Sequence, residues 1–301
     1  MKTLLFYLFT MFLFATAGAQ VTRELKKAGS KERSNPDSSG WKHTGVFVLN
    51  VNQSAQSDWG SGGENFQIGI NAILNKAIHH RKGKYTFDTY LDLELGLVEA
   101  SSFNQFRKTN DRFDLTSDLE HSIGKSTHFA YGILANINTQ LFSGHNFAKE
   151  EHPKISSFFS PGKILLALGI DYKNTRDNRF FGMFITPATI RWVTKLDKDF
   201  YNKNLFGVDS FHRVYTEIGA YLSLHYTNKI SKTANLISRL DLFSNYRRNP
   251  QNVDVLFTNV LTFNISKSFV GSFLLDIVYD QNVKSRTQIQ EITGLGLRLK
   301  F

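Results

Sequence analysis

Asp209, Ser210 and His212 lie close together in "VDSFHR" and supply the three side-chain types of a hydrolytic triad. A triad works only when acid, base and nucleophile converge in space, because the base must take the hydroxyl proton. Residues that follow one another along a loop seldom converge in this way. The sequence therefore predicts a solvated loop here and a protein that is not an enzyme. A membrane-embedded hydrolase with its site at an outer rim is the alternative.

Metal and phosphate chemistry have equally weak support in the sequence. His79, His80, His145 and His152 match no metal-ligand spacing, and the chain has no Cys, which excludes disulfides and thiolate ligands. The Gly-rich run "GSGGEN" is not followed by Lys-Ser or Lys-Thr and leads into a strand-like pattern, whereas phosphate loops lead into a helix. We expect no catalytic residue, no cofactor and no metal site.

Carboxylates at alternate positions form the most informative pattern. In residues 85–100, "YTFDTYLDLELGLVEA", acids alternate with leucines, and residues 111–124, "DRFDLTSDLEHSIG", repeat the scheme. Successive side chains of a strand point to opposite faces, so the acids share one face. The predicted acidic sector comprises Asp88, Asp92, Glu94, Asp114, Asp118 and Glu120. The predicted inward basic residues are Arg239, Arg298 and Lys300, with Glu217 and His225 on a further inward face.

The elements that must position these side chains are strands. From Trp41 to Phe301, apolar residues recur at every second position in about twelve stretches of roughly 9 to 15 residues. One face is rich in Leu, Ile, Phe and Tyr, and the other carries charges. This pattern predicts an all-β fold, a single transmembrane antiparallel up-and-down β-barrel of about 12 strands, with apolar side chains toward lipid and polar ones toward the lumen. A pair of small soluble β-domains is the alternative.

The connections between these segments alternate in length. Short ones such as "HHRKGK", "GKST" and "KNTRDN" alternate with longer ones such as "EASSFNQFRKTN", "SGHNFAKEEHPKISSFFSPG" and "KLDKDFYNKNLFGVDSFHR". Outer-membrane barrels alternate short periplasmic turns with long external loops in the same way. We therefore predict the outer membrane of a Gram-negative bacterium, with both chain ends on the periplasmic side.

The two ends of the chain carry export and assembly signals. Residues 1–19 contain an apolar run that ends in Ala17-Gly18-Ala19, which predicts a cleaved signal peptide. Residues 20–40 are polar and charged and predict a flexible periplasmic leader, so that the barrel covers residues 41–301. Phe301 ends the last alternating segment. A terminal aromatic residue there is a predicted signal for the barrel-assembly machinery.

The charge of the chain limits its partners. The formal net charge is +10, but the Lys and Arg residues are scattered over linkers and turns without a block or a helical stripe. An exported chain of this kind is expected to meet acidic lipid or glycan, and we predict no nucleic-acid partner. The predicted partners are outer-membrane lipid, the assembly machinery during biogenesis and, as an alternative role, other subunits of an outer-membrane assembly.

The first loop supports a family resemblance. Asn52, Gln53 and Ser54, followed by Asp58 and a Trp-Gly-Gly-Glu-Asn motif, resemble a Bacteroidota outer-membrane family classed as domain of unknown function 3078. The first-loop motif comprises Trp59, Gly62, Gly63, Glu64 and Asn65. Further along, the family's pattern is matched by Ser160, Pro161, Gly169, Asp171, Tyr172 and Pro187. The resemblance covers about residues 41–301 and implies a barrel at the outer membrane without an assigned reaction.

The predicted function depends on whether the lumen is open or filled. We predict a non-enzymatic barrel that is either a narrow or plugged channel for small polar solutes or an accessory subunit. A barrel of about twelve strands lies between small filled barrels and open porins, so strand number alone does not decide whether the lumen is open. Charges of both signs on the inner faces favour a constricted lumen, in which they pair.

Overall fold

The computed structural model describes residues 40–55, 66–124, 128–147, 149–266, 269–280, 284–297 and 299–300. The predicted signal peptide, the leader up to residue 39, the first-loop motif (Trp59, Gly62, Gly63, Glu64, Asn65), Arg298 and Phe301 lie outside these ranges. Within them, no helix is long and apolar enough to cross a membrane.

The described chain is built almost entirely from strands. They are β1 (Gly40–Ala55), β2 (Phe66–Lys82), β3 (Tyr85–Ala100), β4 (Phe103–Ser122), β5 (Phe129–Thr139), β6 (Gly144–His145), β7 (Lys154–Ser156), β8 (Gly162–Arg176), β9 (Arg179–Thr194), β10 (Val214–Asn228), β11 (Ala234–Asn245), β12 (Val253–Asn264), β13 (Phe269–Asp280), β14 (Lys284–Leu297) and β15 (Leu299–Lys300). One short 3₁₀ helix, η1 (Lys198–Phe200), lies between β9 and β10.

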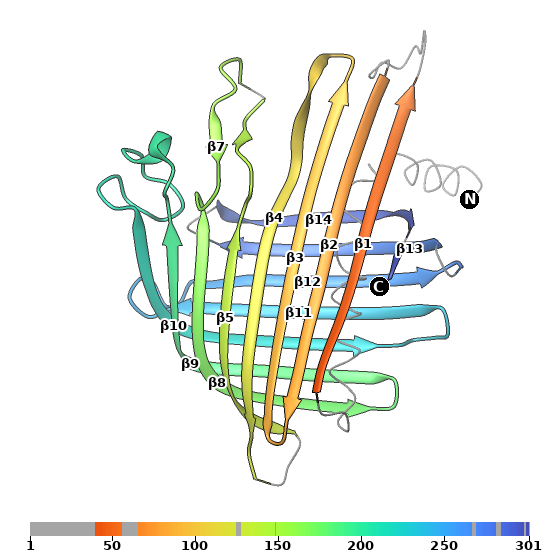
Figure 1. Ribbon diagram of the computed structural model, residues 1–301. Coiled ribbons are helices and arrows are strands. Elements are labelled where there is room, and N and C mark those ends of the chain that lie inside the picture. The colour runs from red at the N-terminus through yellow and green to blue at the C-terminus, as the bar shows by residue number, and fades with distance from the viewer. Residues whose placement is uncertain are drawn as a thin grey trace, which may run out of the picture.

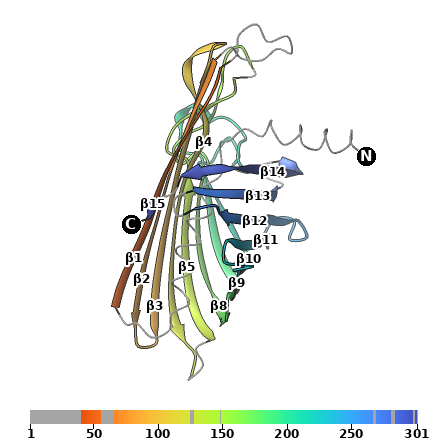
Figure 2. The same ribbon diagram turned by 90° about the vertical axis from the view of Figure 1, so that its right-hand side faces the viewer.

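These strands form one up-and-down antiparallel sheet. Thirteen of them follow the chain order around the sheet, while β6 and β7 pair separately in the loop between β5 and β8. β15 pairs with β1, joining Val46 to Lys300 and Phe47 to Leu299, so the end of the chain lies beside its first strand. The sheet curls so that β1 to β5 form one wall and β8 to β14 the opposite wall (Figures 1 and 2). The predicted barrel of about twelve long strands is confirmed.

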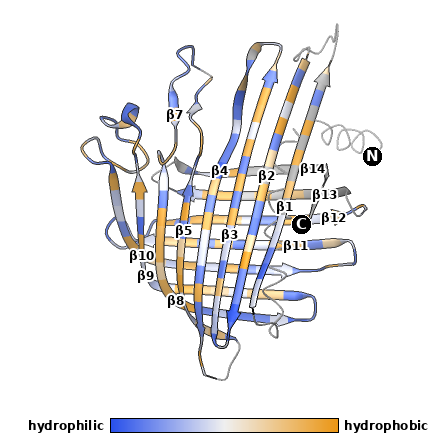
Figure 3. Ribbon diagram, in the orientation of Figure 1, coloured by the Kyte–Doolittle hydropathy of each residue, from blue (hydrophilic) through white to orange (hydrophobic). Residues whose placement is uncertain are grey.

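Alternating side chains give each strand two chemically different faces, as hydropathy along the ribbons shows (Figure 3). In β8, Leu166, Leu168 and Ile170 are exposed on the outer face, while Ala167 and Asp171 are buried on the inner face. This is the inverse of a soluble barrel and suits a barrel with lipid outside.

The connection between β3 and β4 differs from the prediction. We expected a long loop, "EASSFNQFRKTN", but a turn of Ser101 and Ser102 joins the two strands directly. The pairing continues beyond Gly96 through two register shifts, to Arg107 and then Phe103. These strand ends extend past the apolar band, where polar residues need not alternate with apolar ones. The alternation that identifies a strand was therefore absent from this part of the sequence.

Candidate functional site

The inner face of the barrel collects most of the buried charge that the structure describes. Buried carboxylates on the long strands are Asp88, Asp92, Glu94, Asp118, Glu120, Asp171, Glu217, Asp241 and Asp280, whereas Arg191 is the buried cation among the described strand residues. Burial of a charge is unfavourable unless partners compensate it, so these groups must form a network.

The acidic sector forms because β2, β3 and β4 are consecutive neighbours. The register places Asp88 opposite Asp118, and Asp92 opposite Asp114. Like charges directly opposite one another destabilise a sheet, so compensating contacts are needed. His79 from β2 contacts the Asp88 carboxylate.

Amides and one guanidinium supply further donors to this sector. The Asp114 carboxylate accepts hydrogen bonds from Asn136 (2.9 Å) and Asn138 (3.0 Å) of β5. The Glu94 carboxylate lies 3.7 Å from the Arg112 guanidinium and accepts a hydrogen bond from Asn71 at 3.5 Å. The sector is thus held by side chains from both flanking strands.

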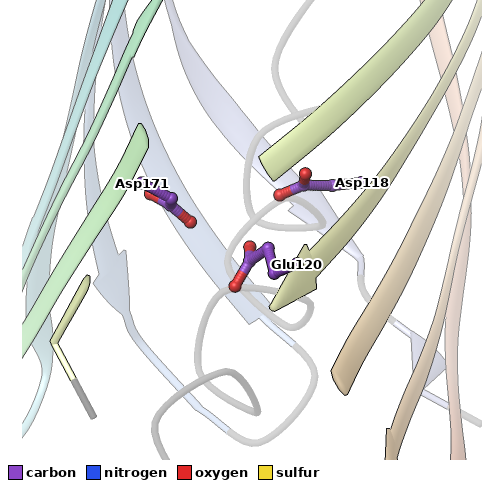
Figure 4. Close-up of side chains that lie close together, drawn as sticks. All are labelled: Asp118, Glu120 and Asp171. Atoms are coloured by element: carbon purple, nitrogen blue, oxygen red, sulfur yellow. The ribbon is translucent and has the colours of Figure 1, made fainter. Parts of the chain in front are cut away.

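Asp118 and Glu120 of β4 converge with Asp171 of β8 (Figure 4). One carboxylate oxygen of each lies within 4.8 Å of the others, the kind of arrangement that binds a hard cation. The Lys173 ammonium group forms ion pairs with Glu120 and, at 2.8 Å, with Asp171. Lys173 therefore supplies positive charge at the position where a metal ion would supply it.

Two ion pairs join strands that are not neighbours in the sheet. The Lys163 ammonium on β8 lies 3.0 Å from the Asp280 carboxylate on β13. The Arg191 guanidinium on β9 lies 2.7 Å from the Asp254 carboxylate on β12. The same guanidinium also contacts Glu217 on the neighbouring strand β10. Intervening strands separate both pairs of elements along the sheet, so these side chains reach across the interior.

Aromatic side chains fill the space beside these bridges. Phe184, Tyr221 and Phe243 form a buried cluster with Ala167. The Arg191 guanidinium lies 3.9 Å from the centre of the Phe243 ring, a cation–π contact. The interior on this side is filled by side chains.

Arg239, predicted to face the lumen, lies beside this aromatic cluster. Its guanidinium lies 2.6 Å from the Asp241 carboxylate, which also accepts a hydrogen bond from the Tyr221 hydroxyl at 2.8 Å. Lys300 pairs with Val46 through its backbone. All six members of the predicted acidic sector occur on the described strands, with Asp114 half-buried and the other five buried.

The sequence interpretation missed Arg191, and a β-bulge explains why. β9 carries an extra residue between Ile185 and Thr189 relative to both neighbouring strands. Thr186 and Thr189 are therefore both buried, while Pro187 between them is exposed. The bulge moves the inward face from even to odd residue numbers. Proline within a central strand is found at bulges, so Pro187 was the available signal.

Lys163, Lys173, Asp171 and Asp280 were also missed as lumen residues. They lie near strand ends or beside residues that are typical of turns, where polar and apolar residues do not alternate clearly. Their partners lie far away in the sequence, and no local pattern identifies such pairs.

Asp209, Ser210 and His212, for which the sequence predicts a solvated loop, take part in a turn of that loop. The Asp209 carboxylate accepts hydrogen bonds from the backbone N–H groups of Phe211 (2.9 Å) and His212 (3.0 Å). His212 lies 2.9 Å from the same carboxylate and is largely exposed. Contact with His212 and then with these N–H groups lowers the pKa of Asp209. The carboxylate closes a loop turn, and Ser210 uses its backbone N–H to bind Asn204.

A buried lysine organises the loop between β9 and β10. Lys195 is fully buried, and its ammonium group donates to the carbonyls of Tyr201 (3.2 Å), Lys203 (2.6 Å) and Asp209 (2.8 Å). The Phe200 ring is also buried, at 1% exposure. The loop thus folds around its own small core.

This loop is joined to the loop between β5 and β8. Lys154 forms ion pairs with Asp197 (3.2 Å) and Asp199 (2.5 Å). The pKa of Asp197 is lowered mainly by the Ser157 hydroxyl and the Asp199 backbone N–H, with Lys154 adding to the effect. The pKa of Lys154 is raised by Asp199 and then Asp197. The two loops form one layer above the same rim.

Aromatic side chains from β1, β3, β5 and β8 lie at the opposite rim, which carries the short turns. Trp41 stacks on His80 with ring centres 4.3 Å apart, and Phe129 lies 4.9 Å from Tyr172. Tyr85 at the start of β3 is 57% exposed. Aromatic girdles of this kind mark the interface between the hydrocarbon region and water in membrane barrels.

The architecture defines an outer-membrane-type β-barrel with a charged interior. Residues 51–145 match the family model described as "Protein of unknown function (DUF3078)", which confirms the resemblance for that part of the chain. No curated protein matches the sequence.

Solved structures similar to this chain include three membrane barrels. The translocator domain of the autotransporter NalP from Neisseria meningitidis is 12% identical, with 92% of this chain and 94% of that chain covered and a TM-score of 0.35. An outer membrane channel from Pseudomonas putida F1 is 11% identical, with 89% and 99% covered and a TM-score of 0.42. The NanC porin is 11% identical, with 85% and 97% covered and a TM-score of 0.37.

Proposed function

We propose that this protein is a non-enzymatic outer-membrane barrel whose constricted lumen admits only small polar solutes. The observation that carries the proposal is the pair of bridges across the interior, between Lys163 and Asp280 and between Arg191 and Asp254. Both bridges begin or end near the strand ends beneath the long loops. A solute must pass between charged groups there, and such groups favour small polar molecules.

Membrane insertion is supported by the outer surface. Leu168 and Ile185 are about half exposed in the middle of their strands, and the aromatic girdle lies at the rim with short turns. We further propose that residues 1–19 are removed on export and that both chain ends are periplasmic. The loop geometry does not support a hydrolase, because the Asp209 carboxylate accepts hydrogen bonds from the loop backbone.

Conductance in planar lipid bilayers tests the constriction. We expect the wild-type barrel to show small or no single-channel steps. The double variant Lys163→Ala with Asp280→Ala removes one bridge without changing net charge, and it should conduct measurably more. Lys149→Ala with Glu150→Ala makes the same charge change in an exposed loop and should behave as wild type. A steady wild-type pore of nanosiemens size would contradict the proposal.

A role as an accessory subunit has one observation in its favour. The loop layer exposes Phe142, Ile155, Phe158 and Phe211, the last at 94%. Exposed apolar groups of this kind mark contact surfaces when they gather in a patch. Tagged protein should then retain a defined partner after mild detergent extraction, and the variant Phe211→Ser with Phe158→Ser should lose it. Recovery of the same proteins with both forms would count against a subunit role.

A further inference from the structure

One level of the inner wall carries polar side chains on neighbouring strands, from β2 through β5 to β8. The register joins these residues directly from strand to strand, in the order Asn75, Asp92, Asp114, Asn138 and Lys163. We call them the bridge-level row. The Lys163 ammonium group at the end of the row lies 3.0 Å from a carboxylate of β13 across the interior. A solute that passes this bridge therefore meets the row.

Asn75 contributes an unsatisfied oxygen to the row. It is 5% exposed, and its side-chain N–H donates to the Leu74 carbonyl at 3.2 Å. A carbonyl only accepts hydrogen bonds, so the amide nitrogen faces Leu74 and the amide oxygen points away from it. This oxygen has no hydrogen-bond donor among the described residues. A buried acceptor without a donor is unfavourable, so the oxygen suits a ligand that carries N–H groups.

Two carboxylates add negative charge beside this oxygen. Asp92 is 4% exposed and lies opposite Asn75 in the register. Asp114, the next residue of the row, accepts hydrogen bonds from neutral groups, namely the amides of Asn136 and Asn138 and the Thr116 hydroxyl. Neutral donors satisfy lone pairs but do not cancel a charge. This part of the wall therefore attracts a cation.

The spacing of the row favours nitrogen cations over a metal ion. Among the residues that the structure describes, the carboxylates close enough together to share one metal ion are Asp118, Glu120 and Asp171, at another level of the wall. Neighbouring strands are about 4.8 Å apart, so the row spans about 10 Å from Asn75 to Asp114. One metal ion holds its oxygen ligands within about 2.6 Å, whereas a molecule with two ammonium groups matches oxygens spread along a row.

We propose that the bridge-level row binds a small organic dication with two primary ammonium groups, so that aliphatic diamines are the solutes of the channel. This inference rests on the proposed constricted channel, whose bridge lies at the same level. One ammonium group donates hydrogen bonds to the Asn75 oxygen and the Asp92 carboxylate, and the other donates to the Asp114 carboxylate. At the far end of the row, Asp280 balances the positive charge of Lys163.

Heat stability of the purified full-length barrel in detergent tests binding without conduction. 1,4-Diaminobutane should raise the temperature at which the heat-resistant folded band is lost on gels, since a ligand that binds only the folded state stabilises it. Mg²⁺ carries the same charge and should raise this temperature less at the same concentration. An equal rise with Mg²⁺ would overturn the assignment to ammonium compounds.

Variants locate the binding site. Asp92→Asn with Asp114→Asn should abolish the rise, whereas Glu150→Gln with Glu151→Gln makes the same charge change in an exposed loop and should retain it. Asn75→Leu should weaken the apparent affinity for the diamine about tenfold, and Asn75→Asp should strengthen it. The Asn75 variants decide the question if the first double variant gives no folded band. Wild-type affinity in Asn75→Leu, or a wild-type rise in Asp92→Asn with Asp114→Asn, contradicts the inference.

Ion selectivity separates this inference from the proposed function. In the barrel opened by Lys163→Ala with Asp280→Ala, the reversal potential in a KCl gradient should show a preference for K⁺. Addition of Asp92→Asn with Asp114→Asn should lower the ratio of K⁺ to Cl⁻ permeability severalfold. A barrel that conducts without preferring K⁺ contradicts the inference but not the channel. A barrel that is stabilised by the diamine and never conducts contradicts the channel but not the binding site.

Discussion

Replacement of Lys195 by Met tests how the folded loop between β9 and β10 is held. Met has a similar length but cannot donate hydrogen bonds, so the carbonyls of Tyr201, Lys203 and Asp209 lose their shared donor. Each hydrogen bond from a charged donor contributes about 1.5 to 3 kcal/mol net. The three bonds share one ammonium group and are not additive, so the total is well below three times this value. The expected loss of local stability is about 3 kcal/mol.

Such a loss should increase the open population of the loop about 100-fold, since about 1.4 kcal/mol corresponds to a factor of ten. Limited proteolysis of the folded barrel with chymotrypsin measures this population, because cleavage after the buried Phe200 requires the loop to open. Cleavage after Phe211 does not require opening, since this residue is 94% exposed, and it serves as an internal reference.

The matched control is Lys198→Met, which removes an exposed lysine from the same loop. It should leave the rate of cleavage after Phe200 within about twofold of wild type, as exposed substitutions usually change stability little. If Lys195→Met and Lys198→Met are cleaved at the same rate, the three carbonyl contacts do not stabilise the loop, and the reasoning fails.

Three further perturbations test the barrel and its loop layer. Gly219→Ala should abolish the heat-resistant folded band on gels, because an added Cβ would lie 2.0 Å from a backbone carbonyl oxygen of β11. Gly182→Ala should be milder, because the nearest atoms to its added Cβ belong to the movable Phe180 ring, at 3.1 Å and 3.2 Å. Leu168→Arg should lower the stability of the barrel in lipid by about 2 to 4 kcal/mol in a denaturant titration, because Leu168 is exposed on the outer face. Ser223 is half-buried on the inner face, and Ser223→Arg should lower the stability less. Acid should release the two loops from each other. Asp197 has a lowered pKa in the folded protein, so its contribution to the stability of the loop contact is present above the ordinary carboxyl pKa. This contribution is lost as pH falls through the lowered pKa. Equal rates of proteolysis in the loops at pH 7 and below pH 3 would contradict this expectation.

Much of the fold was accessible from the sequence because strand periodicity is local. Each strand alternates its side chains regardless of its neighbours, so acids at alternate positions of residues 85–100 and 111–124 already define a polar face. The order of the strands follows from short turns alternating with longer connections. The family resemblance added the first-loop motif, whose residues Trp59 and Glu64 lie outside the described residues.

The tertiary structure decided what fills the lumen. Arg191 faces inward only because a bulge at Pro187 shifts the alternation of β9, and a bulge is stabilised by contacts with neighbouring strands. The bridge from Lys163 to Asp280 depends on the curvature of the whole sheet, which brings β8 and β13 within reach of each other. Periodicity fixes the face on which a side chain lies, but its partner across the barrel is set by the closure of strands distant in sequence.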